Sequence, residues 1–487
     1  MGVDIGTSSS KGVIVDFDGR VLATATREHA VSRPAPGMAE MDADIWWSEF
    51  VAISAELLAA AEGEIVAIGV SGMGPCVVVT DAAGVPLRPA ILYGIDTRAT
   101  AQIRAQSDRF GADEVLARAG SALSTQAVGP KLAWIADNEP AVWARVARLF
   151  MPNSWLAWKL TGEYVLDHHS ASQSVPLYDT DANEWYAAWC RDIAPALELP
   201  RLLWPEDTAG TVGAVAARQT GLPEGIPVII GTIDAWTEAI SVGAVRPGDL
   251  MLMYGTTMFL VSTIRERITV SGLWGTVGAF RSTRSLAGGM ATSGAITSWL
   301  RDLAGSPSYE DLLAEAERSG AGAHGLLMLP YFAGERTPIA DPAARGVIAG
   351  LTIEHTRGDL YRAALEATAF GVRHNVHALR TAGAAVDRVI AVGGGTQGAL
   401  WLQLVSDITG LAQRVPAVTI GAAYGAAYLA ALALSDVSID TWNPEVAVIE
   451  PRPEFRDGYD RLWRLYLELY PATASIVHGL AEGWSHS

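Results

Sequence analysis

The sequence predicts an α/β protein made of two related domains. The chain has 487 residues, more than one hydrophobic core usually supports, and half of its residues are hydrophobic. It opens with the pattern of an antiparallel β-meander, followed by a helix and a buried strand, and the meander pattern returns near the middle of the chain. We therefore expect an N-terminal domain at 1–242 and a C-terminal domain at 243–487.

The first domain begins with three short apolar segments. Residues 2–5 and 11–17 have the pattern of two strands joined by a turn of Gly, Thr and Ser. Asp18-Gly19 then favours a tight type I′ turn into a third strand at 20–26. A helix rich in aromatic residues follows, and 65–70 has the apolar run of a buried strand. This order predicts a mixed α/β layer.

The second domain repeats this order. A last buried strand of the first domain is expected at 224–233, and short apolar segments of the second domain predict strands at 249–259, 260–264, 273–280 and 285–290. Thr356 and Asp359 have the spacing of a capping box at the start of a long helix. A short strand at 388–392 opens directly into Gly393-Gly394-Gly395, and a helix is expected at 399–409.

Two glycine-threonine turns occupy equivalent places in the two halves. The first contains Gly6, Thr7 and Ser8, with Lys11 shortly after, and the second is Gly255-Thr256-Thr257. Such a turn directs backbone N–H groups and hydroxyls at one point, as phosphate requires. Either turn alone fits an ordinary hairpin, but the pair favours a nucleotide held between two domains. Neither turn has the glycine spacing of a Walker loop or of a dinucleotide fingerprint.

Two aspartates follow strands near these turns. Asp4 ends the first strand, where its carboxylate can hold Mg²⁺ directly or through water, or can merely cap the turn. Asp234 follows a buried strand and suits a general base that accepts the proton of an alcohol as it attacks phosphorus. Its alternative role is the N-cap of the next helix, and the sequence leaves both open.

Gly394 and Gly395 lie between a strand and a helix, where bare backbone lets a flat ligand approach closely. We interpret them as a candidate adenosine seat. A nicotinamide-binding site is disfavoured, because the glycines are consecutive and come late in the chain.

Charge and cysteine content exclude several classes of protein. The chain carries 35 Lys and Arg against 53 Asp and Glu, a net charge of -18, which disfavours nucleic acid and anionic membrane surfaces. The two cysteines, Cys76 and Cys190, fit a reducing compartment. We expect no secretory signal before the first strand, and we expect 415–435 to be a buried helix, not a membrane span. The expected location is the cytoplasm.

Several motifs resemble the FGGY family of carbohydrate kinases, over essentially the whole chain. The segment Gly346-Val-Ile-Ala-Gly-Leu351, followed after seven residues by Asp359-Leu-Tyr-Arg-Ala-Ala-Leu-Glu366, is similar to the family's C-terminal pattern at every position. The run Pro130-Lys-Leu-Ala-Trp-Ile135 is similar to its N-terminal pattern.

The resemblance implies two ribonuclease-H-like domains of the actin, hexokinase and Hsp70 type, with an ATP cleft between them. It also implies that Asp234 is the catalytic base, that Asp4 lies at the metal and phosphate site, and that ATP and Mg²⁺ are required. Thr7 and the turn at 255–257 would surround the transferred phosphoryl group, and Gly394 and Gly395 would approach adenosine. A homodimer is a further expectation from the family.

The expected acceptor site departs from better-known members. Pentulose kinases usually carry Ser-Gly-Gln-Met-His-Gly where this chain reads Ser71-Gly-Met73-Gly74-Pro-Cys76. We expect Met73, Gly74, Tyr93, Asp96 and Gln126 to contact the acceptor, together with Asp234.

The predicted function is ATP-dependent phosphorylation of a small sugar or polyol, with a ketopentose such as xylulose as the first expectation. Erythritol, ribitol, glycerol and gluconate are alternative acceptors. A non-catalytic ATP-driven switch is the alternative from another functional class.

Overall fold

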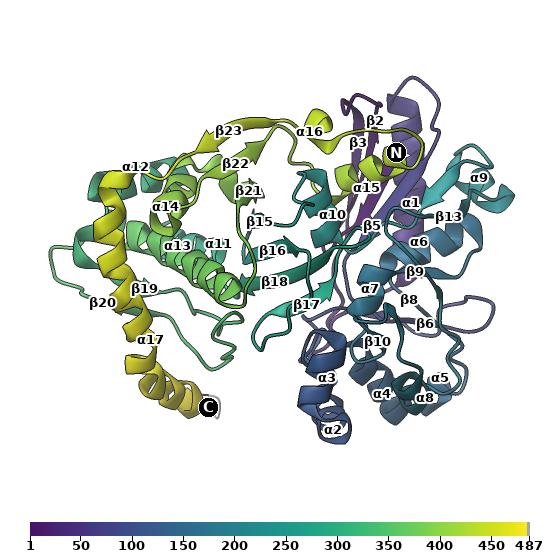
Figure 1. Cartoon of the computed structure of the whole chain (residues 1–487), viewed down its shortest axis with the longest axis horizontal. Coiled ribbons are helices and arrows are strands. Elements are labelled where there is room, and N and C mark those ends of the chain that lie inside the picture. Colours follow the sequence, from purple (N-terminus) through teal and green to yellow (C-terminus); the bar gives the residue numbers. More distant parts are fainter. Residues whose placement is uncertain (485–487) are drawn as a thin grey trace. The chain divides into compact units, whose positions relative to one another are not determined.

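The computed structural model describes residues 1–484 and divides into two compact units (Figure 1). The first unit contains Met1–Arg246, Thr263–Ser285 and Val418–Pro444. The second contains Pro247–Ser262, Leu286–Ala417 and the residues from Glu445 onward. Two segments of the expected C-terminal domain therefore pack with the first unit.

The first unit is built around a six-stranded sheet with the order β13-β14-β5-β1-β2-β3. Its strands are β1 (Gly2–Ile5), β2 (Ser9–Val15), β3 (Val21–Glu28), β5 (Ile68–Gly72), β13 (Thr208–Thr211) and β14 (Pro227–Ile229). The predicted meander is confirmed, because β1, β2 and β3 pair antiparallel in sequence order. Strand β5 runs parallel to β1, and β14 runs parallel to β5. The carboxyl ends of these three strands therefore meet at one edge of the sheet.

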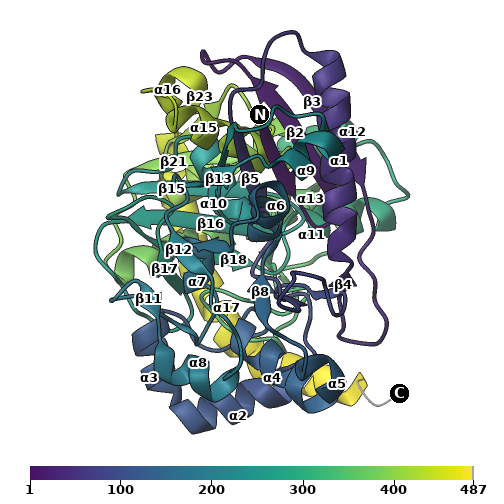
Figure 2. The same cartoon turned by 90° about the vertical axis from the view of Figure 1, so that its right-hand side faces the viewer.

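Helices cover both faces of this sheet. Helix α1 (Ala43–Ala60) lies along β2 and β3, as Figures 1 and 2 both show. Gly12 of β2 faces α1, since a β-carbon there would lie 2.3 Å from Cγ2 of Ile53. On the opposite face, β-carbons at Gly2 and Gly69 would lie about 2 Å from backbone oxygens of helix α15 (Ala422–Leu432). Glycine at these two positions lets α15 lie directly on the sheet.

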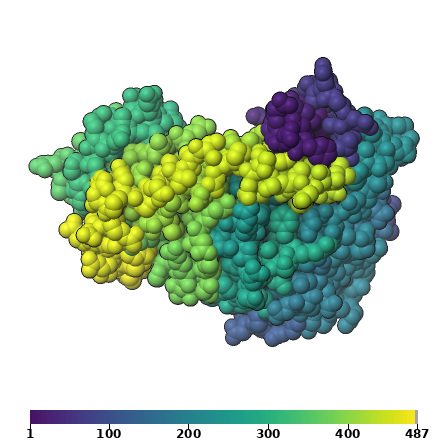
Figure 3. All heavy atoms as spheres, turned by 45° about the horizontal axis from the view of Figure 1, so that its top comes forward, coloured from purple at the N-terminus to yellow at the C-terminus, as the bar shows by residue number. Residues whose placement is uncertain are grey.

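Helix α15 comes late in the chain but belongs to the first unit. Besides the sheet, it contacts α10 (Asp234–Ser241), where a β-carbon at Gly425 would lie 2.0 Å from the carbonyl oxygen of Thr237. The Tyr424 hydroxyl donates to the Gly19 carbonyl at 2.7 Å, and Nε1 of Trp442 donates to the Phe17 carbonyl at 2.9 Å. Figure 3 shows the yellow-green atoms of this segment against the purple N-terminal residues. The predicted buried helix at 415–435 is confirmed for Ala422–Leu432, whereas Val415 and Pro416 belong to strand β22 (Gln413–Pro416).

Short elements complete the first unit. Four two-stranded pairs are β4 (Glu40–Met41) with β7 (Ala90–Ile91), β6 (Val78–Thr80) with β8 (Arg148–Phe150), β9 (Val165–Asp167) with β12 (Arg201–Leu203), and β10 (Tyr178–Asp179) with β11 (Glu184–Trp185). The remaining helices are α2 (Thr100–Phe110), α3 (Ala112–Ala119), α4 (Val128–Asn138), α5 (Pro140–Trp143), α6 (Pro152–Thr161), α7 (His168–Ser172), α8 (Ala187–Ile193), α9 (Ala214–Thr220) and α16 (Ile439–Trp442).

Most strands of the second unit belong to a seven-stranded sheet with the order β17-β18-β16-β15-β21-β22-β23. Its strands are β15 (Asp249–Tyr254), β16 (Met258–Ile264), β17 (Trp274–Val277), β18 (Arg284–Met290), β21 (Arg388–Val392), β22 (Gln413–Pro416) and β23 (Glu445–Ile449). As in the first unit, a hairpin of two antiparallel strands is followed by two strands that join it in parallel and by an antiparallel edge strand. The predicted repeat is therefore present in the strand order.

Helices of the second unit pack around α13 (Arg357–Thr381), which contacts α11 (Gly294–Leu303), α12 (Tyr309–Ser319) and α14 (Ala399–Thr409). The predicted capping box is confirmed, since Thr356 and Asp359 each accept the other's backbone N–H. The remaining elements are β19 (Leu327–Leu329), β20 (Val347–Ala349) and α17 (Arg456–Trp484). Over residues 1–484, no helix combines the length and the apolar character that crossing a membrane requires.

Candidate active site

The first glycine-threonine turn, residues 6–8, joins β1 to β2 in the first unit. The turn is closed by a hydrogen bond from the Gly6 N–H to the Ser9 carbonyl at 3.0 Å. The Thr7 hydroxyl lies 2.8 Å from the Tyr93 hydroxyl, Ser8 is exposed, and Lys11 is exposed on β2. Hydroxyls, an exposed ammonium group and backbone N–H groups are therefore available on one short segment.

A largely buried His-Glu pair supports this turn, although no pattern in the sequence marked it. Nε2 of His29 donates to the Gly6 carbonyl at 3.0 Å, and its Nδ1 lies 2.9 Å from Oε2 of Glu49. The same Glu49 oxygen accepts the Ser10 hydroxyl at 2.6 Å, and the His29 N–H donates to the Ser8 carbonyl. These bonds hold the backbone of the turn through His29, which directly follows strand β3, and through Glu49 of helix α1.

Asp4 lies near the carboxyl end of β1, opposite Ser71 of β5. Its side chain is buried, and its Oδ1 atom has no hydrogen-bond partner. Burial raises the pKa of Asp4, and the negative charges of Asp234 and Glu238 raise it further. An acidic oxygen without a partner in such a place is a position for a cation.

Asp234 is the first residue of α10, and Ile233 is the N-cap. Its carboxylate accepts the Ala235 N–H at 2.8 Å, and burial raises its pKa above the usual value of 3.8. The residue before it, Ile233, is bridged to Gly72 at the end of β5, so Asp4 and Asp234 lie at the same edge of the sheet. A carboxylate with a raised pKa is a competent base near neutral pH.

Glu238 lies one helical turn after Asp234, and the sequence analysis did not single it out. Burial raises its pKa to about 7, repulsion from Asp234 adds to this effect, and Lys11 opposes it. Its position four residues after Asp234 on a helix was the signal available in the sequence. The site thus has three acidic groups and one nearby ammonium group.

The residues present fit a magnesium ion that is held mainly by a nucleotide. No group of three or more acidic, His or Cys side chains in the described part of the chain is arranged to hold a metal. Mg²⁺ is usually bound by one or two carboxylates together with water and substrate phosphates. The unpartnered oxygen of Asp4 would supply one such ligand.

A cavity of about 770 Å³ lies within the second unit. It brings together four residues that the sequence analysis assigned to the nucleotide, namely Gly255, Thr256, Gly394 and Gly395. Thr257 is exposed in the same turn but does not line the cavity. The volume lies in the range typical of small-molecule sites.

Packing requires glycine at position 395, but not at position 394, in the wall of this cavity. A β-carbon at Gly395 would lie 2.8 Å from the Trp401 ring and 2.9 Å from Cβ of Tyr254, whereas one at Gly394 would meet no atom within 4 Å. The backbone at Gly394 is therefore open toward the cavity. The structure adds lining residues that the sequence analysis missed, among them Tyr309, Leu313 and Glu317, which are spaced at i, i+4 and i+8 on α12.

The expected acceptor residues have unequal roles in the first unit. Met73 is 1% exposed and packs in the hydrophobic core. Asp96 is also buried, and its carboxylate accepts from Arg98 through both oxygens and from the Ala39 N–H. Tyr93 and Gln126 are only partly buried, and Oε1 of Gln126 accepts the Gly94 N–H at 2.9 Å. Tyr93, Gly74 and Gln126 are thus better placed to meet a ligand.

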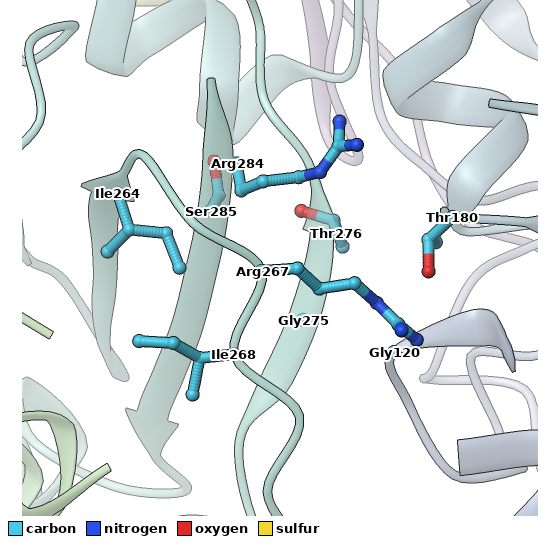
Figure 4. A pocket seen from close by; sticks show the side chains of 9 residues that line it. All are labelled: Gly120, Thr180, Ile264, Arg267, Ile268, Gly275, Thr276, Arg284 and Ser285. Carbon is cyan, nitrogen blue, oxygen red and sulfur yellow. The ribbon is translucent and has the colours of Figure 1, made fainter. Parts of the chain in front are cut away.

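Another cavity, which lies in the first unit, is too small for a ligand (Figure 4). Its volume is about 10 Å³, enough for a single water. Arg267 and Arg284 line it, but Arg267 is bound to Asp181 and to the Ala117 carbonyl.

Comparisons with known proteins agree over nearly the whole chain. The model of the FGGY family of carbohydrate kinases matches with its N-terminal domain over residues 1–241 and with its C-terminal domain over residues 250–434. The crystal structure of a xylulose kinase from Rhodospirillum rubrum is similar, with a TM-score of 0.92, 33% identity, and coverage of 98% of this chain and 99% of that chain.

Two curated relatives are similar in sequence. A xylulose kinase from Staphylococcus epidermidis is 28% identical, with coverage of 99% of this chain and 98% of the relative. A glycerol kinase from Nocardia farcinica is 32% identical, with coverage of 89% of each chain.

Proposed function

Because the chain belongs to the FGGY family of carbohydrate kinases, we propose that it transfers the γ-phosphoryl group of ATP to a primary hydroxyl of a small sugar. A ketopentose such as xylulose is the acceptor to test first, since relatives named xylulose kinases match almost the full chain. The observation that carries the proposal is the pair of buried aspartates, Asp4 and Asp234, at the sheet edge beside the first glycine-threonine turn.

In this mechanism Asp234 is the general base. An alcohol is a weak nucleophile at neutral pH, so a carboxylate within hydrogen-bond reach assists by accepting the hydroxyl proton as the oxygen attacks the γ-phosphorus. The new oxygen–phosphorus bond forms as the bond to the β-phosphate oxygen breaks, and ADP leaves. The raised pKa of Asp234 matches this task, because the carboxylate can hold the proton near neutral pH.

The remaining residues position the phosphates and the nucleoside. Thr7, Ser8 and Lys11 offer hydroxyl and ammonium donors beside Gly6, and Thr256 and Thr257 offer hydroxyl donors in the second unit. Mg²⁺, when bound with Asp4 as a ligand, would neutralise phosphate charge. Gly394 and Gly395 would receive adenosine in the cavity of the second unit.

Further parts of the proposal concern the whole protein. In this proposal the first expected domain holds the base and binds the acceptor, and the second expected domain binds adenosine. We place the protein in the cytoplasm, as its two cysteines are both free thiols. A homodimer is also proposed, from the family resemblance alone.

A polyol acceptor is the second candidate within the same chemistry, since a relative named a glycerol kinase is 32% identical. The test is an acceptor-dependent ADP-release screen with pentuloses, hexuloses, pentitols, erythritol, glycerol and gluconate. We expect at least one of them to stimulate ADP release strongly, and we expect Asp234→Asn to abolish the stimulation with ATP binding retained. A protein that binds ATP but responds to no acceptor would support the switch alternative, and near wild-type turnover by Asp234→Asn would exclude it as the base.

A further inference from the structure

Ile233 and Gly74 meet beside the proposed base. Ile233 directly precedes Asp234, is 1% exposed, and forms a parallel bridge with Gly72 at the end of β5. Gly74 follows two residues after that bridge. Two segments far apart in the sequence therefore come together immediately next to Asp234.

The Ile233 side chain occupies the space that a side chain at position 74 would need. A β-carbon at Gly74 would lie 2.7 Å from Cγ1 and 2.8 Å from Cδ1 of Ile233. These distances are far below the roughly 3.5–4.0 Å of an ordinary carbon–carbon contact. Glycine at 74 and a branched apolar residue at 233 are therefore complementary.

The neighbouring residues add no side-chain hydrogen-bonding group. Met73 is buried in the core, and Pro75 has neither an N–H nor a polar side chain. The thiol of Cys76 is buried and directed at the Met73 carbonyl, 3.6 Å away. An acceptor carbon lying against Ile233 and residues 73–76 would therefore meet aliphatic side chains, backbone and a thiol directed at a carbonyl.

We propose that Gly74 and Ile233 form one specificity element, which selects an acceptor that bears hydrogen instead of hydroxyl on the carbon facing this pair. The inference rests on the proposed kinase function and adds the substrate class: a deoxy-sugar or deoxy-polyol with a primary hydroxyl. A hydroxyl at that carbon would lose hydrogen bonds to water and gain none from the side chains of Ile233, Met73 or Pro75. An apolar pocket rejects such a hydroxyl by roughly 10- to 100-fold in kcat/KM.

The test uses acceptor pairs that differ by one hydroxyl. D-Xylulose is compared with each of its single deoxy analogues, and glycerol with propane-1,2-diol and propane-1,3-diol, in an ADP-release assay. We expect one deoxy analogue to exceed its parent by roughly 10- to 100-fold in kcat/KM. If every parent is used better than its analogues, the inference is overturned while the kinase function stands. If no acceptor stimulates ADP release, the proposed function itself fails.

Three variants test whether the preference for a deoxy acceptor depends on Gly74 and Ile233. Ile233→Ala should reduce the ratio between analogue and parent by about tenfold, because it opens room for a solvated hydroxyl. Gly74→Ala should lower kcat/KM for all acceptors, and adding Ile233→Ala should restore part of that loss, as expected for residues in contact. The control is Ile230→Ala, an equally buried isoleucine that packs in a separate cluster with Ala157 and Val165.

These readouts separate specificity from stability. Loss of a buried isoleucine side chain lowers the thermal midpoint in both Ile→Ala variants, but only Ile233→Ala should change the acceptor ratio. An unchanged ratio in Ile233→Ala, or additive losses in the double variant, would contradict the proposal.

Discussion

Replacing Gly394 by alanine tests the proposed adenosine seat. A β-carbon at this position meets no protein atom within 4 Å, and Gly394 is not among the residues with positive φ. The folded protein should therefore accept the methyl group, with a change in stability of less than about 1 kcal/mol. The methyl group would project into the cavity that Gly394 lines.

The expected effect of Gly394→Ala is weaker binding of ATP. If adenosine lies against the bare backbone, an added methyl overfills the contact at a cost of about 1–3 kcal/mol. Since about 1.4 kcal/mol is a factor of ten, the Kd for ATP should rise roughly tenfold. At a fixed ATP concentration far above Kd, the stabilisation by ATP should fall by about 1.4 kcal/mol.

Isothermal titration with ATP, together with thermal unfolding, measures both quantities. Gly458→Ala is the matched control, because a β-carbon at Gly458 also meets nothing within 4 Å and the residue lies on α17, outside the cavity lining. Gly395→Ala is the contrasting variant, expected to lower the thermal midpoint because its β-carbon would lie 2.8 Å from the Trp401 ring. Wild-type ATP affinity in Gly394→Ala would refute the assignment.

Three further predictions concern the first unit. Because burial raises the pKa of Asp234 above 3.8 and a base must be deprotonated, kcat/KM should fall on acidification at a pH well above 4. The Glu238→Gln variant removes a nearby negative charge, so it should move this acidic limb of the pH–rate profile to lower pH. An unmoved limb would exclude electrostatic coupling between Glu238 and Asp234. Asp4→Asn should abolish transfer yet stabilise the fold by about 1–3 kcal/mol near neutral pH. The pKa of Asp4 is raised on folding, so wild-type stability declines as pH rises from 3.8 through that raised pKa, and the gain in melting temperature of the Asp4→Asn variant should vanish near pH 4. Glu49→Ala should raise KM for ATP several-fold, because it releases His29 from the turn at Gly6. The control Glu56→Ala breaks an exposed ion pair between α1 and Arg27 and should leave KM unchanged. Equal effects of the two variants would contradict the proposed support of the turn by His29 and Glu49.

The hairpins and the two turns were predictable, because they depend on local signals. Alternating apolar residues and Gly-Thr turns predicted both hairpins, and the strand at Arg388–Val392 and the helix at Ala399–Thr409 have the predicted bounds. Strand β5 joins β1 in parallel and β14 joins β5 in parallel, which explains why Asp4 and Asp234, 230 positions apart, lie at one sheet edge.

Other features depend on contacts that no local pattern reports. The segment at 418–444 packs with the first unit because Gly2 and Gly69 let α15 lie on its sheet, and chain order alone gave no sign of this. The only sequence signal of Glu238 is its position four residues after Asp234, and the His29–Glu49 pair has none; burial and hydrogen bonding distinguish these residues in the structure. Asp96, predicted to meet the acceptor, is also held in a buried ion pair with Arg98.

The most direct test of the central proposal is to measure ADP and phosphorylated acceptor in the same reaction. Mass spectrometry of the products, with ATP, Mg²⁺ and the best acceptor from the screen, should give the two in equal amounts, with neither formed by Asp234→Asn. ADP released with free phosphate and no phosphorylated acceptor would contradict the proposal.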